Sequence, residues 1–173
     1  RIILGFAIGG ALSLAGVILQ GMFRNPLVEP YTLGISGGAA LGTSICIILK
    51  LNRLIPDIAM PLSGFIGALL VILLVYFINT RRGIFMIQGL LLTGVMISFI
   101  SSSLVILILA ISRTEDLHGI IFWIMGSLEE PNWVLIWVAT TASLACLAFS
   151  YLFGLGMNAL SLGEEEAIHL GVD

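Results

Sequence analysis

The sequence predicts an all-α fold: a polytopic transmembrane protein built from spanning helices. Of its 173 residues, 59% are hydrophobic and only 10% are charged, whereas soluble domains carry about 25% charged residues. The mean hydropathy is +1.16. The seven basic and ten acidic residues all lie outside the long apolar runs. Because a charge at the centre of a bilayer costs at least ~2.5 kcal/mol, this separation is what a hydrocarbon core requires.

Five apolar runs have about the 20 residues that a helix needs to cross a bilayer. They are Ile2–Phe23, Tyr31–Leu49, Ile58–Ile78, Ile84–Ile111 and Trp133–Met157. None of them alternates polar and apolar residues as the strands of a membrane barrel do. We therefore expect five spanning helices, the second near the lower limit of length, within one transmembrane domain that covers residues 1–173.

A structural break is predicted between the first two runs. Asn25, Pro26 and Pro30 lie there, in a short polar stretch. Each proline lacks an N–H donor and pushes the residue before it toward an extended conformation, so no continuous helix fits. One helix should end near Phe23, and another should start after Pro30.

Small and polar residues on either side of this break suggest helix packing. Gly34, Gly38 and Gly42 recur at intervals of four, which places them on one helix face and lets another helix approach closely in lipid. Gln20 is a polar amide near the end of the first run. It either hydrogen-bonds a neighbouring helix or the broken backbone near Asn25, or it lines a translocation path.

The fourth run is the most polar span and is our first choice for a helix that lines a path. It carries an amide and several hydroxyl groups, at Gln88, Thr93, Ser98, Ser101, Ser102 and Ser103. Serine in a membrane helix can also bond back to its own backbone, which gives the alternative of a slightly bent packing helix.

Two further segments predict short helices. Residues 112–128 hold an apolar stretch too short to span, which is typical of an interfacial or re-entrant helix. After the last span, Ser161 and Glu164 have the spacing of a capping box, and acidic residues fill the first turn. Gly171 is able to end this helix in the left-handed conformation. We expect a short amphipathic helix at about Leu162–Leu170, which is either a solvated acidic segment or a contact with a partner.

Several function classes find little support in the composition. The net charge of −3 and the lack of a basic cluster predict no nucleic-acid partner. Cys46 and Cys146 lie in apolar runs, and His118 and His169 are isolated, so no metal site is expected. No phosphate-binding loop of the Walker type is present. Because the chain begins at Arg1 without a methionine, we expect it to be an internal piece of a longer protein.

Two alternative functions can be weighed from the residues. Gly34-Ile35-Ser36-Gly37 fits the G-x-S-G pattern of rhomboid-type intramembrane serine proteases. That chemistry needs a histidine base beside the serine, and both histidines lie outside the spans. An ion-translocating subunit would need ionisable residues within the membrane, and the predicted spans contain none.

Three stretches carry a family resemblance. The first has matching residues on both sides of the proline break, at Gln20, Asn25, Pro26, Leu27, Pro30, Leu33, Gly34, Gly38, Ala39 and Gly42. The second is the W-x-M-G-S-L element from Trp123 to Leu128, and the third is LGEEEAIHLGV from Leu162 to Val172. Together they resemble the permease subunits of type II ABC importers for iron-siderophores, haem and cobalamin.

The resemblance implies a fold and a set of partners. The chain would cover the second to sixth helices of a ten-helix permease in the cytoplasmic membrane, and the start of its coupling segment. The permease would form a homodimer and contact membrane lipid, two ATPase subunits and an extracytoplasmic binding protein that delivers a metal-chelate substrate. It would not be an enzyme and would bind no cofactor, since the partner ATPase uses the ATP and Mg²⁺.

The resemblance also implies roles for particular residues. Arg1 would dock the binding protein. Ile87 and Gln88 would form the inner constriction of the path, to which we add Gln20 as a candidate. The residues that couple to the ATPase would be Gly163, Glu164, Glu165, Glu166, Ala167, Leu170 and Gly171. The resemblance alone places this acidic segment in the cytoplasm, since three against four basic residues on the two sides do not fix the orientation.

Overall fold

The computed structural model describes residues 1–53, 55–80, 87–129 and 132–171, and for Ile87, Gln88, Glu164 and Glu165 the backbone alone. Within these ranges the chain is helical and has no strand. It divides into two compact units, and each is described by itself. The predicted all-α transmembrane fold is confirmed.

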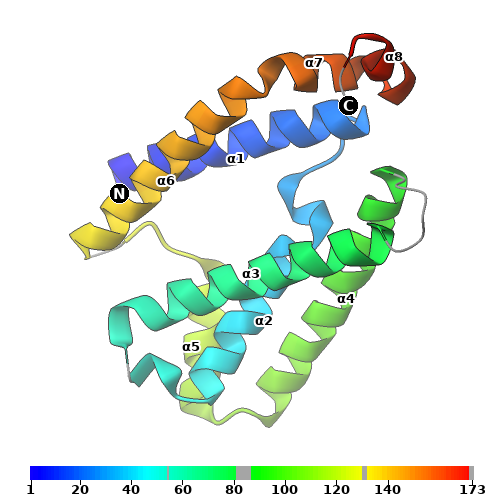
Figure 1. The fold of residues 1–173 in the computed structure, drawn as a ribbon. Helices are drawn as coiled ribbons and strands as arrows, with labels where there is room; N and C mark the ends of the chain where they lie inside the picture. The colour runs from blue at the N-terminus through cyan, green and yellow to red at the C-terminus, as the bar shows by residue number, and fades with distance from the viewer. Residues whose placement is uncertain (54, 81–86, 130–131, 172–173) are drawn as a thin grey trace. The chain divides into compact units, whose positions relative to one another are not determined.

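Unit 1 consists of residues 1–30 and 128–173. It holds α1 (Ile2–Phe23), α6 (Trp133–Leu152), α7 (Gly154–Leu162) and α8 (Glu164–His169). In Figure 1, α1 runs beside α6 and α7, and α8 packs against α7. Two ends far apart in the sequence thereby come together.

Unit 2 consists of residues 31–127. It contains the helix α2 (Ile35–Ile48), the long pair α3 (Pro56–Thr80) and α4 (Ile87–Ile111), the short helix α5 (Thr114–Met125) and the 3₁₀ turn η2 (Leu51–Arg53). It also holds all but the first residue of the 3₁₀ turn η1 (Pro30–Leu33). The centre of this unit is α2, which packs against α3, α4 and α5 (Figure 1). The helix α5 lies within the segment for which a short, non-spanning helix is predicted.

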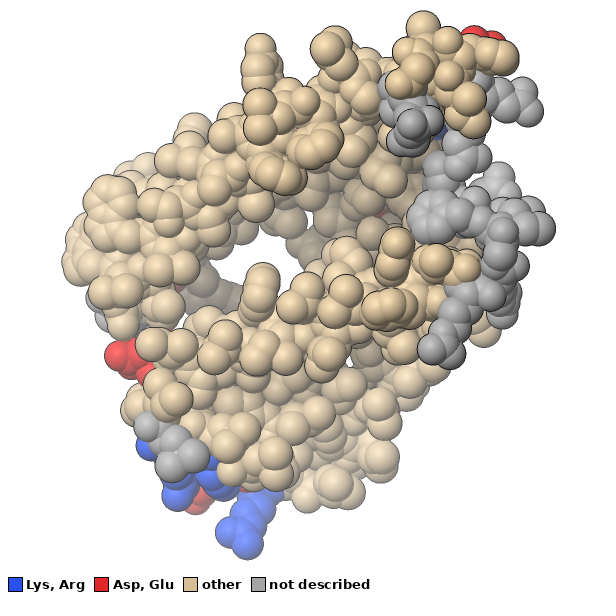
Figure 2. All heavy atoms as spheres, viewed as in Figure 1, with Lys and Arg blue, Asp and Glu red and all other residues tan. Residues whose placement is uncertain are grey.

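Four helices of the described chain are long and apolar enough to cross a membrane: Ile2–Phe23, Pro56–Thr80, Gly89–Ile111 and Trp133–Leu152. Their flanks carry many exposed large apolar side chains, which is the surface that lipid requires. Figure 2 shows charged side chains gathered at the end of unit 2 that carries η2 and the α4–α5 turn, while the visible helix flanks are free of charge. The chain is a multi-pass membrane protein.

The second predicted span needs a correction. Tyr31–Leu49 does not form one spanning helix, because its first residues form η1 and Gly34 adopts φ 80°. The α-helix that follows has only 14 residues and is about 21 Å long at 1.5 Å per residue. It is therefore shorter than the ~30 Å hydrocarbon core.

The last span and the acidic helix also differ from the prediction. The run from Trp133 to Met157 breaks at Phe153, whose N–H bonds the Ser150 carbonyl at 3.2 Å. A separate helix, α7, then continues to Leu162. Ser161 is inside α7 and its hydroxyl donates to the Asn158 carbonyl at 2.6 Å, so the predicted capping box is wrong. Gly163 precedes α8 instead.

Candidate functional site

The proline break is held together by side chains that bond the backbone. Arg24 ends α1 in the left-handed conformation, with φ 49°. The Asn25 side-chain oxygen accepts from the Leu27 N–H at 2.9 Å. The Gln20 amide donates to the carbonyls of Pro26 at 3.1 Å and Val28 at 3.4 Å. Of the roles considered for Gln20, the structure shows the one in which it satisfies the broken backbone.

The predicted packing glycines lie against the backbones of other helices. A Cβ on Gly38 would be 2.6 Å from the Gly67 carbonyl oxygen, and one on Gly42 would be 2.4 Å from that of Ser63. Both contacts are with α3. Gly34 differs, since it precedes α2 and its Cβ would be 2.9 Å from the Gly94 oxygen of α4. The three glycines thus do not share a single contact face.

Three polar side chains of the most polar span point into unit 2. The Asn79 amide of α3 donates to the Thr93 hydroxyl at 3.2 Å, and also to the Val75 carbonyl at 2.8 Å. Ser101 is 3% exposed, and its Cβ would be 3.1 Å from a Cβ on Gly37. Ser98 lies beside Gly34 and Gly37. Helix packing thus uses three of the six polar groups on which the prediction of a path was based.

The predicted gate residues Ile87 and Gln88 are the first two residues of α4. Their side chains lie outside the described part of the chain. Their place at the start of the helix agrees with the predicted position at one end of the span, and their role stays a prediction.

The short helix α5 is anchored to α2 and α3. Lys50 at the end of α2 forms an ion pair with Asp116, and Ile120 is 1% exposed. The Trp123 ring would lie 3.0 Å from a Cβ on Gly64. His118 Nδ1 lies 2.7 Å from the Thr114 carbonyl of its own helix.

Within unit 2, the structure separates Ser36 from the helix that carries His118. Ser36 is in the first turn of α2, whereas α5 packs near Ile47 at the other end of that helix. The α5 helix, which carries His118, thus contacts α2 about three helical turns from Ser36. Among the described residues, no group of three or more His, Cys, Asp or Glu could hold a metal ion.

The acidic segment at residues 162–171, for which a coupling role is predicted, has an inner and an outer side. Gly163 adopts φ 130° at the turn between α7 and α8, and Ala167 is only 1% exposed. Ile168 and Leu170 are 67% and 62% exposed. Gly171 has φ 82°, which is the left-handed end expected from the sequence. The surface that this segment offers therefore comprises Ile168, which the sequence did not single out, rather than Ala167.

Two arginines lie at opposite ends of unit 1. Arg1, the predicted docking residue, forms an ion pair with Glu129, and both side chains are more than 60% exposed. Arg24 lies at the other end of α1, and its guanidinium approaches Gly163. Sequence reasoning missed Arg24, although it directly precedes the proline break.

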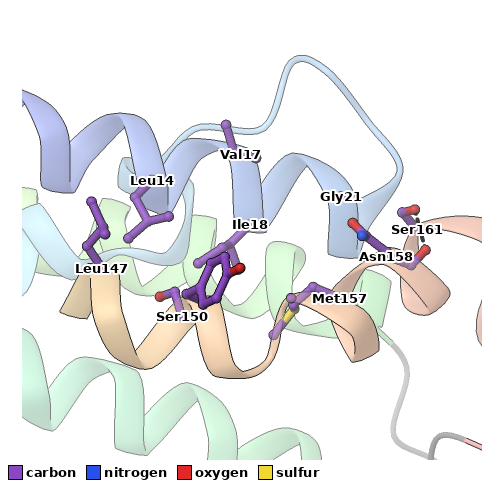
Figure 3. A pocket seen from close by; sticks show the side chains of 11 residues that line it. Leu14, Val17, Ile18, Gly21, Leu147, Ser150, Met157, Asn158 and Ser161 are labelled. Atoms are coloured by element: carbon purple, nitrogen blue, oxygen red, sulfur yellow. Dashed lines mark hydrogen bonds between the residues drawn. The ribbon is translucent and has the colours of Figure 1, made fainter. Parts of the chain in front are cut away.

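A cleft of about 380 Å³ lies between α1 and the α6–α7 pair. Figure 3 shows its apolar lining, with Leu14, Val17 and Ile18 from α1 and Leu147 from α6. Asn158 and Ser161 lie at the α7 end of this cleft.

Comparison with known proteins places this geometry in a family. The model of the FecCD transport family matches residues 1–173. The chain is 37% identical to a molybdate import system permease of Haemophilus influenzae, covering 99% of this chain and 50% of that protein. It is 35% identical to a hemin transport system permease of Yersinia pestis, covering 100% of this chain and 52% of that protein. A cobalamin import permease of Halobacterium salinarum is 34% identical, over 100% of this chain and 46% of that protein.

A solved structure agrees with these relatives. It is described as an inward-facing conformation of a metal-chelate type ABC transporter, with a TM-score of 0.87 and 34% identity. The similarity covers 100% of this chain and 54% of the other. This chain thus spans about half the length of the curated relatives that it matches. From the full-length match to the family model, the protein belongs to the FecCD transport family.

Proposed function

We propose that the chain is part of the membrane permease of an ATP-driven importer, and that the transported substrate is a metal chelate such as haem, cobalamin or an iron-siderophore. The observation that carries the proposal is the similarity of the whole chain to the metal-chelate type transporter, with a TM-score of 0.87. The names of the hemin and cobalamin relatives support the substrate class. The molybdate relative makes an oxyanion the competing substrate.

The permease would work in the cytoplasmic membrane with several partners. We infer a second copy of the permease, two ATPase subunits that use ATP and Mg²⁺, and an extracytoplasmic binding protein. The α7–α8 segment suits a contact with the ATPase, because Ile168 and Leu170 are exposed apolar side chains that follow the exposed Glu166. A short helix that lays exposed apolar side chains into a groove is a common mode of recognition.

Arg1 would take part in docking the binding protein. Its guanidinium already pairs with Glu129, so an acidic group of the partner would have to compete with an internal carboxylate. Since exposed ion pairs contribute only about 0–1 kcal/mol, this competition costs little.

Ile87 and Gln88 would lie at the inner constriction of the path, where a two-fold axis brings two copies of the same segment together. Cysteine at position 87 or 88 should then crosslink to its symmetry mate, and labelling by a polar thiol reagent should change with nucleotide. If no intersubunit crosslink forms and nucleotide does not alter the labelling, the gate lies elsewhere.

Uptake by the reconstituted complex tests the function itself. The full-length permease with its ATPase and binding protein should accumulate haem, cobalamin or a ferric siderophore in vesicles when ATP is present. Uptake of molybdate alone would reject the metal-chelate class, and no uptake of any of these substrates would reject the proposal.

A pair of variants then tests the coupling surface. Ile168→Glu should abolish uptake and transport-coupled ATPase stimulation while insertion into the membrane stays normal. Leu51→Glu is the matched control, because Leu51 is also an exposed apolar residue on a short turn but lies outside the coupling segment. Equal effects of the two changes would remove α8 from the coupling role.

A further inference from the structure

A single arginine side chain connects the end of α1 to the turn of the acidic segment. A Cβ placed on Gly163 would lie 2.9 Å from Arg24 Nη1 and 3.6 Å from its Cζ. The guanidinium therefore lies directly against the backbone at the turn between α7 and α8. Gly163 itself is buried, although its neighbour Leu162 is exposed.

The backbone conformation of Arg24 indicates that its side chain matters. Arg24 and Lys50 are the two non-glycine residues with positive φ in the described chain. Glycine is the residue that adopts this conformation without strain at the end of a helix. An arginine here accepts backbone strain, and a strained position that persists is a reason to look for a role of the side chain.

The charge at this place fits its surroundings. The carbonyls at the C-terminal end of α7 carry partial negative charge, which a cation stabilises. Three consecutive glutamates follow Gly163 in the sequence, and Arg1 and Arg24 are the two Lys or Arg residues in the ranges that form unit 1. Arg1 is engaged with Glu129 at the other end of α1. Arg24 is thus the basic residue that the fold brings to the acidic segment.

We propose that Arg24 is a positioning residue for ATPase coupling: it holds the α7–α8 turn against the end of α1, so that the turn presents the exposed Ile168 and Leu170 in a fixed arrangement. This role rests on the proposed function of the segment. The guanidinium reaches the turn through Nη1, the atom nearest to a Cβ placed on Gly163, and a side chain at Gly163 would push it away. The same contact links a movement of α8 to the loop that Gln20 and Asn25 hold together.

The test separates the effect of the backbone conformation of Arg24 from the effect of its side chain. Arg24→Gly relieves the left-handed strain but removes the guanidinium, while Arg24→Lys keeps a charge without the planar group. Lys50→Gly is the matched control, since it also relieves a positive φ at the end of a helix and removes a cation, but in unit 2. All variants are made in the full-length permease with its partners.

Hydrogen exchange and uptake are both measured. We expect Arg24→Gly to speed amide exchange at residues 163–171 at least tenfold, with no change inside α1, and to lower ATP-driven uptake at least threefold. Arg24→Lys should recover part of both. Lys50→Gly should leave exchange at residues 163–171 unchanged.

The possible failures are distinguishable. Unchanged exchange at residues 163–171 in Arg24→Gly would overturn the contact. Faster exchange with normal uptake would show that the contact is structural only and overturn the role in coupling. If the wild-type complex shows no ATP-driven uptake, the proposed function fails, and the role in coupling fails with it, while the exchange measurement still decides whether Arg24 holds the turn.

Discussion

Glycines of α1 and glycines of α2 lie in different surroundings. In unit 2, Gly38 and Gly42 are so close to α3 that a Cβ on either would overlap its backbone. In unit 1, no described atom comes within 4 Å of a Cβ placed on Gly9 or Gly10. Gly10 instead lines a cavity of about 150 Å³ between α1 and α6.

The difference teaches that small residues permit a close contact but do not create one. The partner helix must also present small residues at the crossing point. α3 does so with Ser63 and Gly67, whereas α6 lines the cavity beside α1 with Leu144 and Leu147 as well as Thr140 and Ser143. A glycine on one helix is therefore not enough for close packing.

The two units also differ in what their polar side chains connect. In unit 2, Asn79 is 6% exposed and bonds across from α3 to α4. In unit 1, Gln20 bonds to the backbone of the loop that directly follows its own helix. The buried amide of unit 2 therefore joins two helices, while the Gln20 amide of unit 1 holds a loop next to its own helix.

The largest effect should come from filling the closest helix contact. A Cβ on Gly67 would lie 2.2 Å from the Gly38 oxygen, and backbone atoms cannot move aside as side chains do. We expect Gly67→Ala to destabilise unit 2 by about 1–3 kcal/mol. In a Cys146→Ser background, the buried Cys46 thiol should react with a fluorogenic dye at a lower temperature. An unchanged melting temperature would contradict the tight α2–α3 contact.

A smaller loss should follow from removing the link between α3 and α4. Asn79→Ala leaves the Thr93 hydroxyl without its donor and should cost about 1 kcal/mol. Thr80→Ala is the control, because that hydroxyl donates only to the Tyr76 carbonyl of its own helix at 2.9 Å. The same thiol assay should show a shift for Asn79→Ala alone. Equal melting of the two variants would mean that the link adds no stability.

Removing either of the two ion pairs should cost still less stability than removing the Asn79 link, and the two losses should be unequal. Asp116 is 13% exposed and Lys50 36% exposed, whereas Arg1 and Glu129 are 66% and 72% exposed. Asp116→Asn should therefore lower stability by roughly 0.5 kcal/mol, and Glu129→Gln by less than that. Thermal melting at low and high salt checks this, since only the Asp116 variant should differ from wild type at both. A larger loss of stability for Glu129→Gln than for Asp116→Asn would contradict this order of the two ion pairs.

The smallest effect should come from the open glycine of α1. Gly9→Ala meets no described neighbour and adds a better helix former, so stability should change by no more than about 0.5 kcal/mol, toward a gain. Melting followed by circular dichroism at 222 nm measures this. A marked loss would show that another segment of the protein packs closely on α1.

Much of the fold could be predicted from the sequence because the signals are local. The end of α1 at Phe23 follows from the prolines beyond it, and the spans Pro56–Thr80 and Ile87–Ile111 follow from long apolar runs. The left-handed end at Gly171 also depends only on its own residue type. Such features need no knowledge of what the chain packs against.

The acidic segment marks the limit of local reasoning. Ser161 and Glu164 have the spacing of a capping box, yet α7 continues through Ser161. Similarly, Ala167 belongs to the expected coupling residues but is buried, and Ile168 is exposed in its place. A six-residue helix between two turns has too little sequence to fix which of its sides faces inward, so packing within unit 1 decides it.

The sequence alone determined that this is a membrane protein, where its first helix ends, and which family motifs it carries, because hydropathy and proline geometry act within a few residues. Only the tertiary structure decided which glycines touch another helix, which polar groups of α4 are used in packing, and that Arg24 meets Gly163. Those outcomes depend on the surface of the helix or turn against which each residue packs. Arg24 and Gly163 are more than a hundred residues apart in the sequence, and no local pattern encodes such a surface.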